Sequence, residues 1–367
     1  MSSSGGLKKL IFVVVIAAVA VPLRYGSTNH KYLLVRLLHS TLTLKNCFVV
    51  DPGRQTLSPA YRAFEEMMKM SPPQSFVHST NPLATIQSVR ASFSFSDIIP
   101  EPSGCQMIKE TFTHDGRTVD GYWIDHREKD LRKQSEQIIL YFHGGGYMLG
   151  DINFYSGIEC HLSRLFNVPI LHLEYRLIPE HPVPSAVEDA ITIYRSLLTQ
   201  NVSPSRIVIM GDSAGGGLAL LTVQSLINHK IPVPRGIVAI APWTDFSASG
   251  ESYTRNQPTD VMLRTDNTKW QAKVIMDTYG SKILPTDPIV SPLFGSFKGF
   301  PPLYVNVGTA DILEDDGRAV VKKAQEAGVE VKFEAGLHMM HVYPLFFSYF
   351  PEARDTLDNI NKWMQSI

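Results

Sequence analysis

The sequence predicts an α/β fold in which a mostly parallel central sheet carries helices on both faces and a helical cap precedes it. From residue 138 onward, short apolar segments alternate with longer segments of helical periodicity. This order of strand, helix and strand is typical of parallel sheets that are buried on both faces. From residue 51 to residue 102, the chain is instead rich in proline and serine and holds short helical patterns, which favours a cap over a second core.

The predicted strands are short runs rich in Val, Ile and Leu. They cover residues 138–142, 169–174, 207–210, 237–240, 303–307 and 329–333. The predicted helices cover residues 155–166, 184–198, 214–228, 266–279 and 317–327, with a last one near the C-terminus. Apolar and polar residues alternate along segments 108–113 and 119–124, which flank the turn residues Asp115-Gly116. This pattern predicts an antiparallel hairpin.

These patterns divide the chain into three predicted parts. Residues 1–26 form a targeting segment or membrane anchor, residues 27–104 a helical cap and residues 105–367 the main unit. Residues 246–290 interrupt the alternation of strands and helices, and we expect them to contribute to the cap.

Composition excludes several classes of function. The formal net charge is -1 and charged residues make up 19% of the chain, so no basic surface indicates a nucleic-acid partner. The three cysteines show neither a CxxC motif nor metal-ligand spacing, so no metal site is expected. Cys160 lies in a helical pattern and is expected to be an ordinary buried residue, whereas pairing of Cys47 with Cys105 is left open.

The N-terminus has the pattern of a targeting sequence. Residues 10–23 are uncharged and follow Lys8 and Lys9, as in the charged and apolar regions of a signal. We favour an uncleaved signal anchor with the catalytic unit lumenal or extracellular; the alternative is a secreted protein cleaved near Ala18-Val19-Ala20. The sequon at Asn201 is compatible with both.

A second apolar pattern follows this segment. Five leucines at positions 33, 34, 37, 38 and 42 recur at helical spacing, with Lys31, Arg36 and Lys45 between them. One interpretation is a basic helix that lies on a membrane surface. The other is that these leucines form the underside of a cap and pack on the main unit.

Ser213 is the predicted nucleophile. It lies in Gly211-Asp212-Ser213-Ala214-Gly215, between an apolar strand and a helical run. A serine on such a strand-to-helix turn is strained and exposes its Oγ, and the flanking glycines allow the strand and the helix to approach closely.

A serine nucleophile needs a base and a group that orients the base. The strand ends of a parallel sheet share one edge, and Asp311 and His341 each follow a predicted strand. The order Ser213, Asp311, His341 is that of an α/β-hydrolase triad. His338 competes with His341 for the role of base. Glu314, Asp315 and Asp316 are expected to begin the next helix, where acidic side chains suit the dipole.

The tetrahedral intermediate of ester hydrolysis needs hydrogen-bond donors for its oxyanion. His143-Gly144-Gly145-Gly146 follows the strand at 138–142, and its glycines can turn their N–H groups toward the strand ends. The expected donors are Gly144, Gly145 and Ala214. His143 is expected to shape this loop.

Together these motifs resemble the hormone-sensitive-lipase-like branch of α/β-hydrolase esterases, which includes arylacetamide deacetylases. The resemblance adds Glu174-Tyr175-Arg176-Leu177, Ala241-Pro242-Trp243-Thr244-Asp245 and Ser291-Pro292-Leu293-Phe294. It implies a cofactor-independent serine esterase, and we expect hydrophobic or lipid-like esters as small-molecule substrates. The alternatives are an amide deacetylase with the same triad and a non-catalytic ligand-binding member. Arg176 is expected to pair with Glu188 or Asp189.

Overall fold

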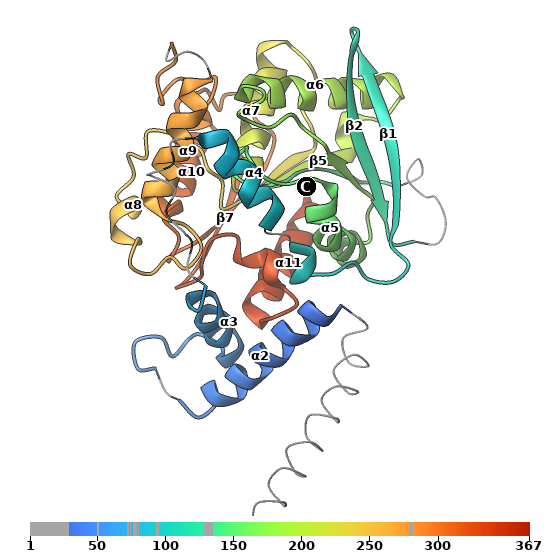
Figure 1. The fold of residues 1–367 in the computed structure, drawn as a ribbon. Coiled ribbons are helices and arrows are strands. Elements are labelled where there is room, and N and C mark those ends of the chain that lie inside the picture. Colours follow the sequence, from blue (N-terminus) through green and yellow to red (C-terminus); the bar gives the residue numbers. More distant parts are fainter. Residues whose placement is uncertain are drawn as a thin grey trace, which may run out of the picture.

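The computed structural model describes residues 29–49, 51–71, 73, 75, 79, 81–92, 95–127, 135–278 and 282–367. Its centre is an eight-stranded sheet in the order β1-β2-β4-β3-β5-β6-β7-β8 (Figure 1). The strands are β1 Gln106–His114, β2 Arg117–Asp125, β3 Ile138–Phe142, β4 Ile170–Leu173, β5 Ile207–Asp212, β6 Gly236–Ile240, β7 Leu303–Gly308 and β8 Val331–Gly336. Strands β3 to β8 are parallel to one another. Strand β2 pairs antiparallel with both β4 and β1, so β1 has the same direction as the parallel strands. The predicted α/β fold and its terminal hairpin are confirmed.

Helices lie on both faces of this sheet. They are α5 Ile152–Phe166, α6 Val183–Thr199, α7 Ala214–Asn228, α10 Glu314–Glu326 and α11 Pro351–Ser366. The predicted helix at 214–228 is matched at both ends. Several other boundaries are wrong by two or three residues, among them the starts of α5 and α10 and both ends of β8. Helix α10 begins at Glu314 because the three acidic residues form its first turn, and β8 begins later because the Val329 N–H donates to Ala324 O at the end of α10.

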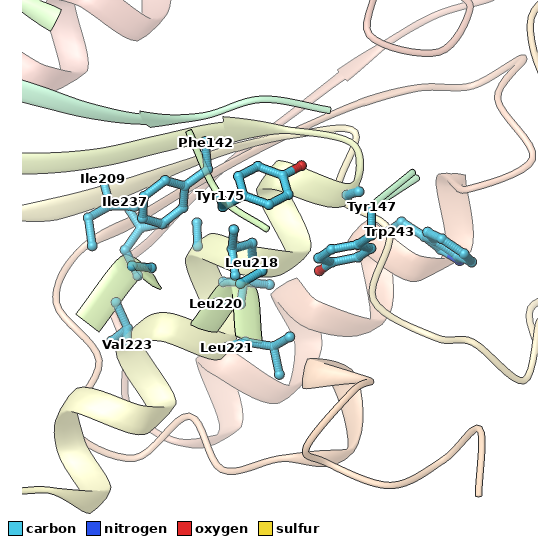
Figure 2. Packing of buried hydrophobic residues seen from close by; sticks show 14 of the residues in the cluster. Phe142, Tyr147, Tyr175, Ile209, Leu218, Leu220, Leu221, Val223, Ile237 and Trp243 are labelled. Atoms are coloured by element: carbon cyan, nitrogen blue, oxygen red, sulfur yellow. The ribbon is translucent and has the colours of Figure 1, made fainter. Parts of the chain in front are cut away.

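The core lies between the central strands and the helices that cover them. Phe142 of β3, Ile209 of β5 and Ile237 of β6 pack against Leu218 and Val223 of α7 (Figure 2). Every residue of β3, β5 and β6 is buried, as expected of parallel strands covered on both faces. This packing holds the carboxyl ends of the strands, and the loops that follow them, in fixed positions.

Further helices come from the two predicted cap segments. The N-terminal ones are α2 His30–Asn46, α3 Pro59–Lys69 and α4 Pro82–Ser92. Helices α8 Ser252–Arg255 and α9 Thr265–Asp277 come from the predicted second cap segment. The two segments touch, because Ser75 Oγ donates to Asp266 Oδ2 over 3.1 Å. The division at residues 26 and 104 stays a prediction.

A disulfide joins Cys105 to Cys160, and Cys47 is free and exposed. The expectation that Cys160 is an ordinary buried residue is therefore wrong. The bridge joins residues 55 positions apart, and it ties the start of β1 to α5 where Gly157 touches the backbone of Ile99. Sequence spacing carries no signal of such a contact between distant elements.

Helix α2 turns its polar side inward. Its buried residues are Tyr32, Arg36, His39 and Asn46, whereas Leu34, Leu37 and Leu38 are exposed. The interpretation of the five leucines as the underside of a cap is therefore wrong for these three, whereas Leu33 and Leu42 are half-buried. No helix in the described part of the chain is long and apolar enough to cross a membrane, and the predicted anchor at 10–23 lies outside the described residues.

Candidate active site

Ser213 occupies the turn between β5 and α7 with φ of 53°, in the region that non-glycine residues rarely adopt. Gly215 makes the turn possible, because a Cβ on it would lie 1.9 Å from Phe142 O. A Cβ on Gly211 would lie 2.4 Å from Gly215 O. The strained serine and the two flanking glycines are therefore placed as the motif predicts.

Asp311 and His341 reach Ser213 from the loops after β7 and β8. His341 Nδ1 lies 2.7 Å from Asp311 Oδ2, and His341 Nε2 lies 2.9 Å from Ser213 Oγ. A carboxylate only accepts hydrogen bonds, so the proton sits on Nδ1 and Nε2 accepts from the serine hydroxyl. The three predicted residues thus form one continuous hydrogen-bonded chain, with Asp311 and His341 buried.

His338 lies outside this chain. Its backbone N–H donates to Thr309 Oγ1 over 2.7 Å and its carbonyl accepts from Tyr61 Oη over 3.0 Å. Its φ of 60° reverses the chain direction between β8 and His341. The described residues offer no hydrogen-bond partner to its ring.

Three carboxylates, those of Asp311, Asp260 and Asp212, raise the pKa of His341. Burial alone would lower this pKa, but Asp311 and, more weakly, the other two carboxylates raise it above its ordinary value of 6.5. Asp260 is itself half-buried, and desolvation followed by the charge of Asp311 raises its pKa to about 7. Asp260 was missed at the sequence level because it lies inside the cap insertion and follows no strand.

The glycine loop after β3 differs from the expectation at one residue. The Gly144 N–H points into the protein, where it donates to Tyr155 Oη at 3.0 Å and Asp212 Oδ1 at 3.1 Å. Gly145 and Gly146 line the cavity beside Ser213. Gly144 is therefore wrongly placed among the donors for an oxyanion. The sequence gives no sign of this, because the three glycines are identical neighbours.

Asp212 holds the inner side of this loop. Tyr141 and Tyr155 donate to its two oxygens over 2.8 and 2.9 Å, and desolvation raises its pKa to about 6. His143 is completely buried, and this burial lowers its pKa to about 3. A neutral buried ring that stacks on Tyr175 fits the predicted role of shaping the loop.

A cavity of about 350 Å³ opens over Ser213 and His341. Its walls come from both predicted cap segments and from the main unit. Most of the lining side chains are apolar, among them Met68, Phe95, Phe154, Val261, Met262 and Val342. Among the described residues, no three potential metal ligands gather to form a site. Arg176 pairs with Glu188 and Asp189, as predicted.

A family model of the alpha/beta hydrolase fold matches residues 139–345, which include the whole hydrogen-bonded chain. The chain belongs to the alpha/beta hydrolase family. An esterase of Acinetobacter venetianus is 31% identical over 72% of this chain and 86% of its own length. An acetyl-hydrolase of Streptomyces hygroscopicus is 36% identical over 62% of this chain and 74% of its own length.

Solved structures agree with this assignment. An esterase from the bacterial hormone-sensitive lipase family has a TM-score of 0.71 and 31% identity, and the match covers 84% of this chain and 98% of that one. EstE5, soaked with p-nitrophenyl butyrate, has a TM-score of 0.74 and 29% identity over 84% of this chain and 99% of that one. This alpha/beta hydrolase is therefore an esterase-type hydrolase, and its resemblance to the hormone-sensitive-lipase-like branch is confirmed.

Proposed function

We propose that the protein is a serine carboxylic ester hydrolase with Ser213 as nucleophile, His341 as general base and Asp311 as the group that orients the base. The observation that carries the proposal is the continuous chain from Ser213 Oγ through His341 to Asp311 Oδ2. Such a chain activates an otherwise weak serine nucleophile.

In the proposed reaction, His341 Nε2 takes the hydroxyl proton while Ser213 Oγ attacks the ester carbonyl carbon. His341 then gives this proton to the leaving alcohol as the bond between carbonyl carbon and alcohol oxygen breaks. A water, deprotonated by the same histidine, attacks the acyl-enzyme, and the acid leaves with Ser213 restored.

We assign the oxyanion to the N–H groups of Gly145, Gly146 and Ala214. Among the described residues, none of these three groups donates to a protein acceptor, and both glycines border the same cavity as Ser213. Gly144 holds the loop in place, because its N–H donates to Asp212 on the side away from the cavity. Removing one oxyanion donor typically lowers kcat about 100- to 1000-fold.

The cavity supports hydrophobic acyl groups as substrates. Its lining is mainly apolar, and its volume of about 350 Å³ lies in the range of small-molecule sites. A chain of methylene groups gains about 0.8 kcal/mol for each group that leaves water. We therefore expect kcat/KM to rise from acetyl toward medium-chain esters.

We also propose that the catalytic unit works in an oxidising compartment, either lumenal or extracellular. The disulfide between Cys105 and Cys160 supports this, since such bonds are rare in the cytosol. Asn201 of the sequon is exposed on the turn after α6, so a glycan attached to it would extend into solvent.

The test compares His341→Ala with His338→Ala in hydrolysis of p-nitrophenyl butyrate. We expect His341→Ala to lower kcat by about 10⁴-fold or more, as removal of a triad base does elsewhere, and His338→Ala to keep most of the activity. Near-normal turnover by His341→Ala would refute the assignment. A parallel assay with the matching butyryl anilide distinguishes ester hydrolysis from amide deacetylation.

A further inference from the structure

Helix α2 has the reverse of the usual amphipathic pattern. A surface helix normally turns its apolar side toward the core. Here the inward stripe is polar: Arg36, only 8% exposed, donates to Ser348 O over 2.6 Å, and the ring of His39 lies 2.8 Å from Ala60 O. The polar stripe is thus used for attachment to the rest of the protein, and the apolar residues are left outside.

The outward face is mostly apolar, with the exposed Thr41 between its leucines. Leu34 is 67% exposed and Leu44 is 64% exposed, with Leu37 and Leu38 between them. Phe48, which follows the helix, is 81% exposed, and Val49 beside it is also exposed. We call these six residues, namely Leu34, Leu37, Leu38, Leu44, Phe48 and Val49, the leucine face. Exposed apolar surface of this kind marks a site of interaction.

The charges beside the leucine face are paired. Lys31 lies 3.0 Å from Asp97, and Lys45 lies 2.9 Å from Glu66. The third basic residue of the predicted basic helix, Arg36, is buried beneath it. The partner of the leucine face is therefore expected to be apolar and not strongly anionic.

The leucine face is linked to the wall of the substrate cavity through α3. Helix α2 packs along α3. Arg62 Nη2 in the first half of α3 donates to Asn46 O over 2.7 Å, and Lys45 near the end of α2 reaches Glu66 in the second half of α3. Met68 of α3 and Ser71, two residues beyond it, line the cavity, and Ser71 is exposed. Figure 1 shows α2 as the outermost labelled helix at the bottom of the view, with α3 and α11 between it and the sheet.

The sequence before α2 is apolar as well. Residues 10–23 are uncharged, and the stretch that ends at residue 28, directly before α2, lies outside the described residues. Six mostly polar residues, 24–29, separate this apolar stretch from the start of α2. So short a connection spans at most about 20 Å, so a lipid surface that takes up the apolar stretch lies within reach of α2, which favours such a surface over a second copy of the chain as the partner.

We propose that the leucine face docks on a zwitterionic lipid bilayer and brings the cavity entrance to the membrane surface. Helices with one strongly apolar face lie in the interface plane with that face among the acyl chains. Hydrophobic esters then reach Ser213 from the lipid phase. The inference rests on the proposed function for this last step, but docking itself requires no turnover.

Cys47 provides a direct probe, because the other two cysteines form the disulfide. An environment-sensitive fluorophore is attached to Cys47 of the full chain carrying Ser213→Ala, and phosphatidylcholine vesicles are added. We expect a blue shift of emission and quenching by brominated acyl chains, with little change between 0.05 and 0.5 M salt. Absence of the shift would overturn the proposal, as would a requirement for anionic lipid that high salt abolishes.

Two variants locate the surface. Replacing Leu34 and Leu44 together by Gln is expected to weaken vesicle binding about tenfold or more. The matched control is Leu284→Gln, a leucine that is 70% exposed in a different segment, which should bind as the parent does. Equal binding by the double variant would overturn the proposal, and so would a dimer in sedimentation that this variant dissolves.

The consequence for activity is measured separately with active protein. The double variant should hydrolyse a soluble acetate ester normally and a vesicle-embedded medium-chain ester several-fold more slowly. If neither ester is hydrolysed by the parent enzyme, the proposed function fails while the docking result stands. If the double variant hydrolyses both esters as the parent does, docking does not serve substrate access.

Discussion

The backbone N–H of Ile312 donates to Asp260 Oδ2 over 2.9 Å, which links the cap insertion to the loop that carries Asp311. The same carboxylate accepts from the N–H groups of Met262 and Leu263. Asp260 is therefore held in place beside the buried pair of Asp311 and His341, where its charge raises the pKa of His341.

Replacing Asp260 by Asn is expected to shift the acidic limb of the pH profile of kcat/KM. The base must be neutral to accept a proton, so kcat/KM rises with pH through the pKa of His341, which lies above 6.5. Asn keeps the shape but removes a charge that raises this pKa, so the limb should move to lower pH. The measurement is a pH profile of kcat/KM with a soluble ester, and an unchanged limb would show that Asp260 has no electrostatic effect on the base.

Gly215→Ala is expected to destabilise the protein by roughly 3 kcal/mol or more, because overpacking against rigid backbone leaves no room for adjustment. The added Cβ would lie 1.9 Å from Phe142 O. Gly53→Ala is the control, since its Cβ would meet its nearest neighbour at 3.7 Å. Urea unfolding curves measure both variants, and similar midpoints would contradict the account of the turn.

The disulfide is expected to stabilise the folded state by about 4 kcal/mol at most. This is the free energy that corresponds to the entropy lost by the unfolded chain when a bridge closes a loop of this length. The bridged residues are separated by 55 positions. Replacing Cys105 and Cys160 together by Ala should lower the unfolding temperature, whereas Cys47→Ala should leave it unchanged. Equal effects of the two changes would argue against the bridge.

His39 makes stability depend on pH beneath α2. Burial, more than the charge of Arg36, lowers the pKa of His39 to about 4, below its ordinary value of about 6.5. The neutral ring stabilises the folded state fully above pH 6.5, and this contribution is lost as pH falls toward 4. As the pH falls from 6.5 to about 4, the free energy of unfolding should therefore decrease less in His39→Gln than in the parent. Urea unfolding at each pH measures this decrease.

The sequence predicted the sheet, the helices that cover it and the Ser213, Asp311 and His341 set, because each of these follows from local patterns and strand order. It did not predict contacts between distant elements. The bridge from Cys105 to Cys160 joins the start of β1 to α5, and Asp260 reaches Asp311 and His341 from an insertion that follows no strand. Gly144 was placed wrongly because only the fold shows which way each N–H of the loop points.

The central claim is that Ser213 is the nucleophile of this hydrolase. Its most direct measurement is mass spectrometry of the protein after treatment with a fluorophosphonate, which phosphonylates an activated serine. The account predicts one adduct, on the peptide that contains Ser213, and its loss in Ser213→Ala and in His341→Ala. Labelling of a different residue, or an unlabelled Ser213 in protein that hydrolyses esters, would contradict it.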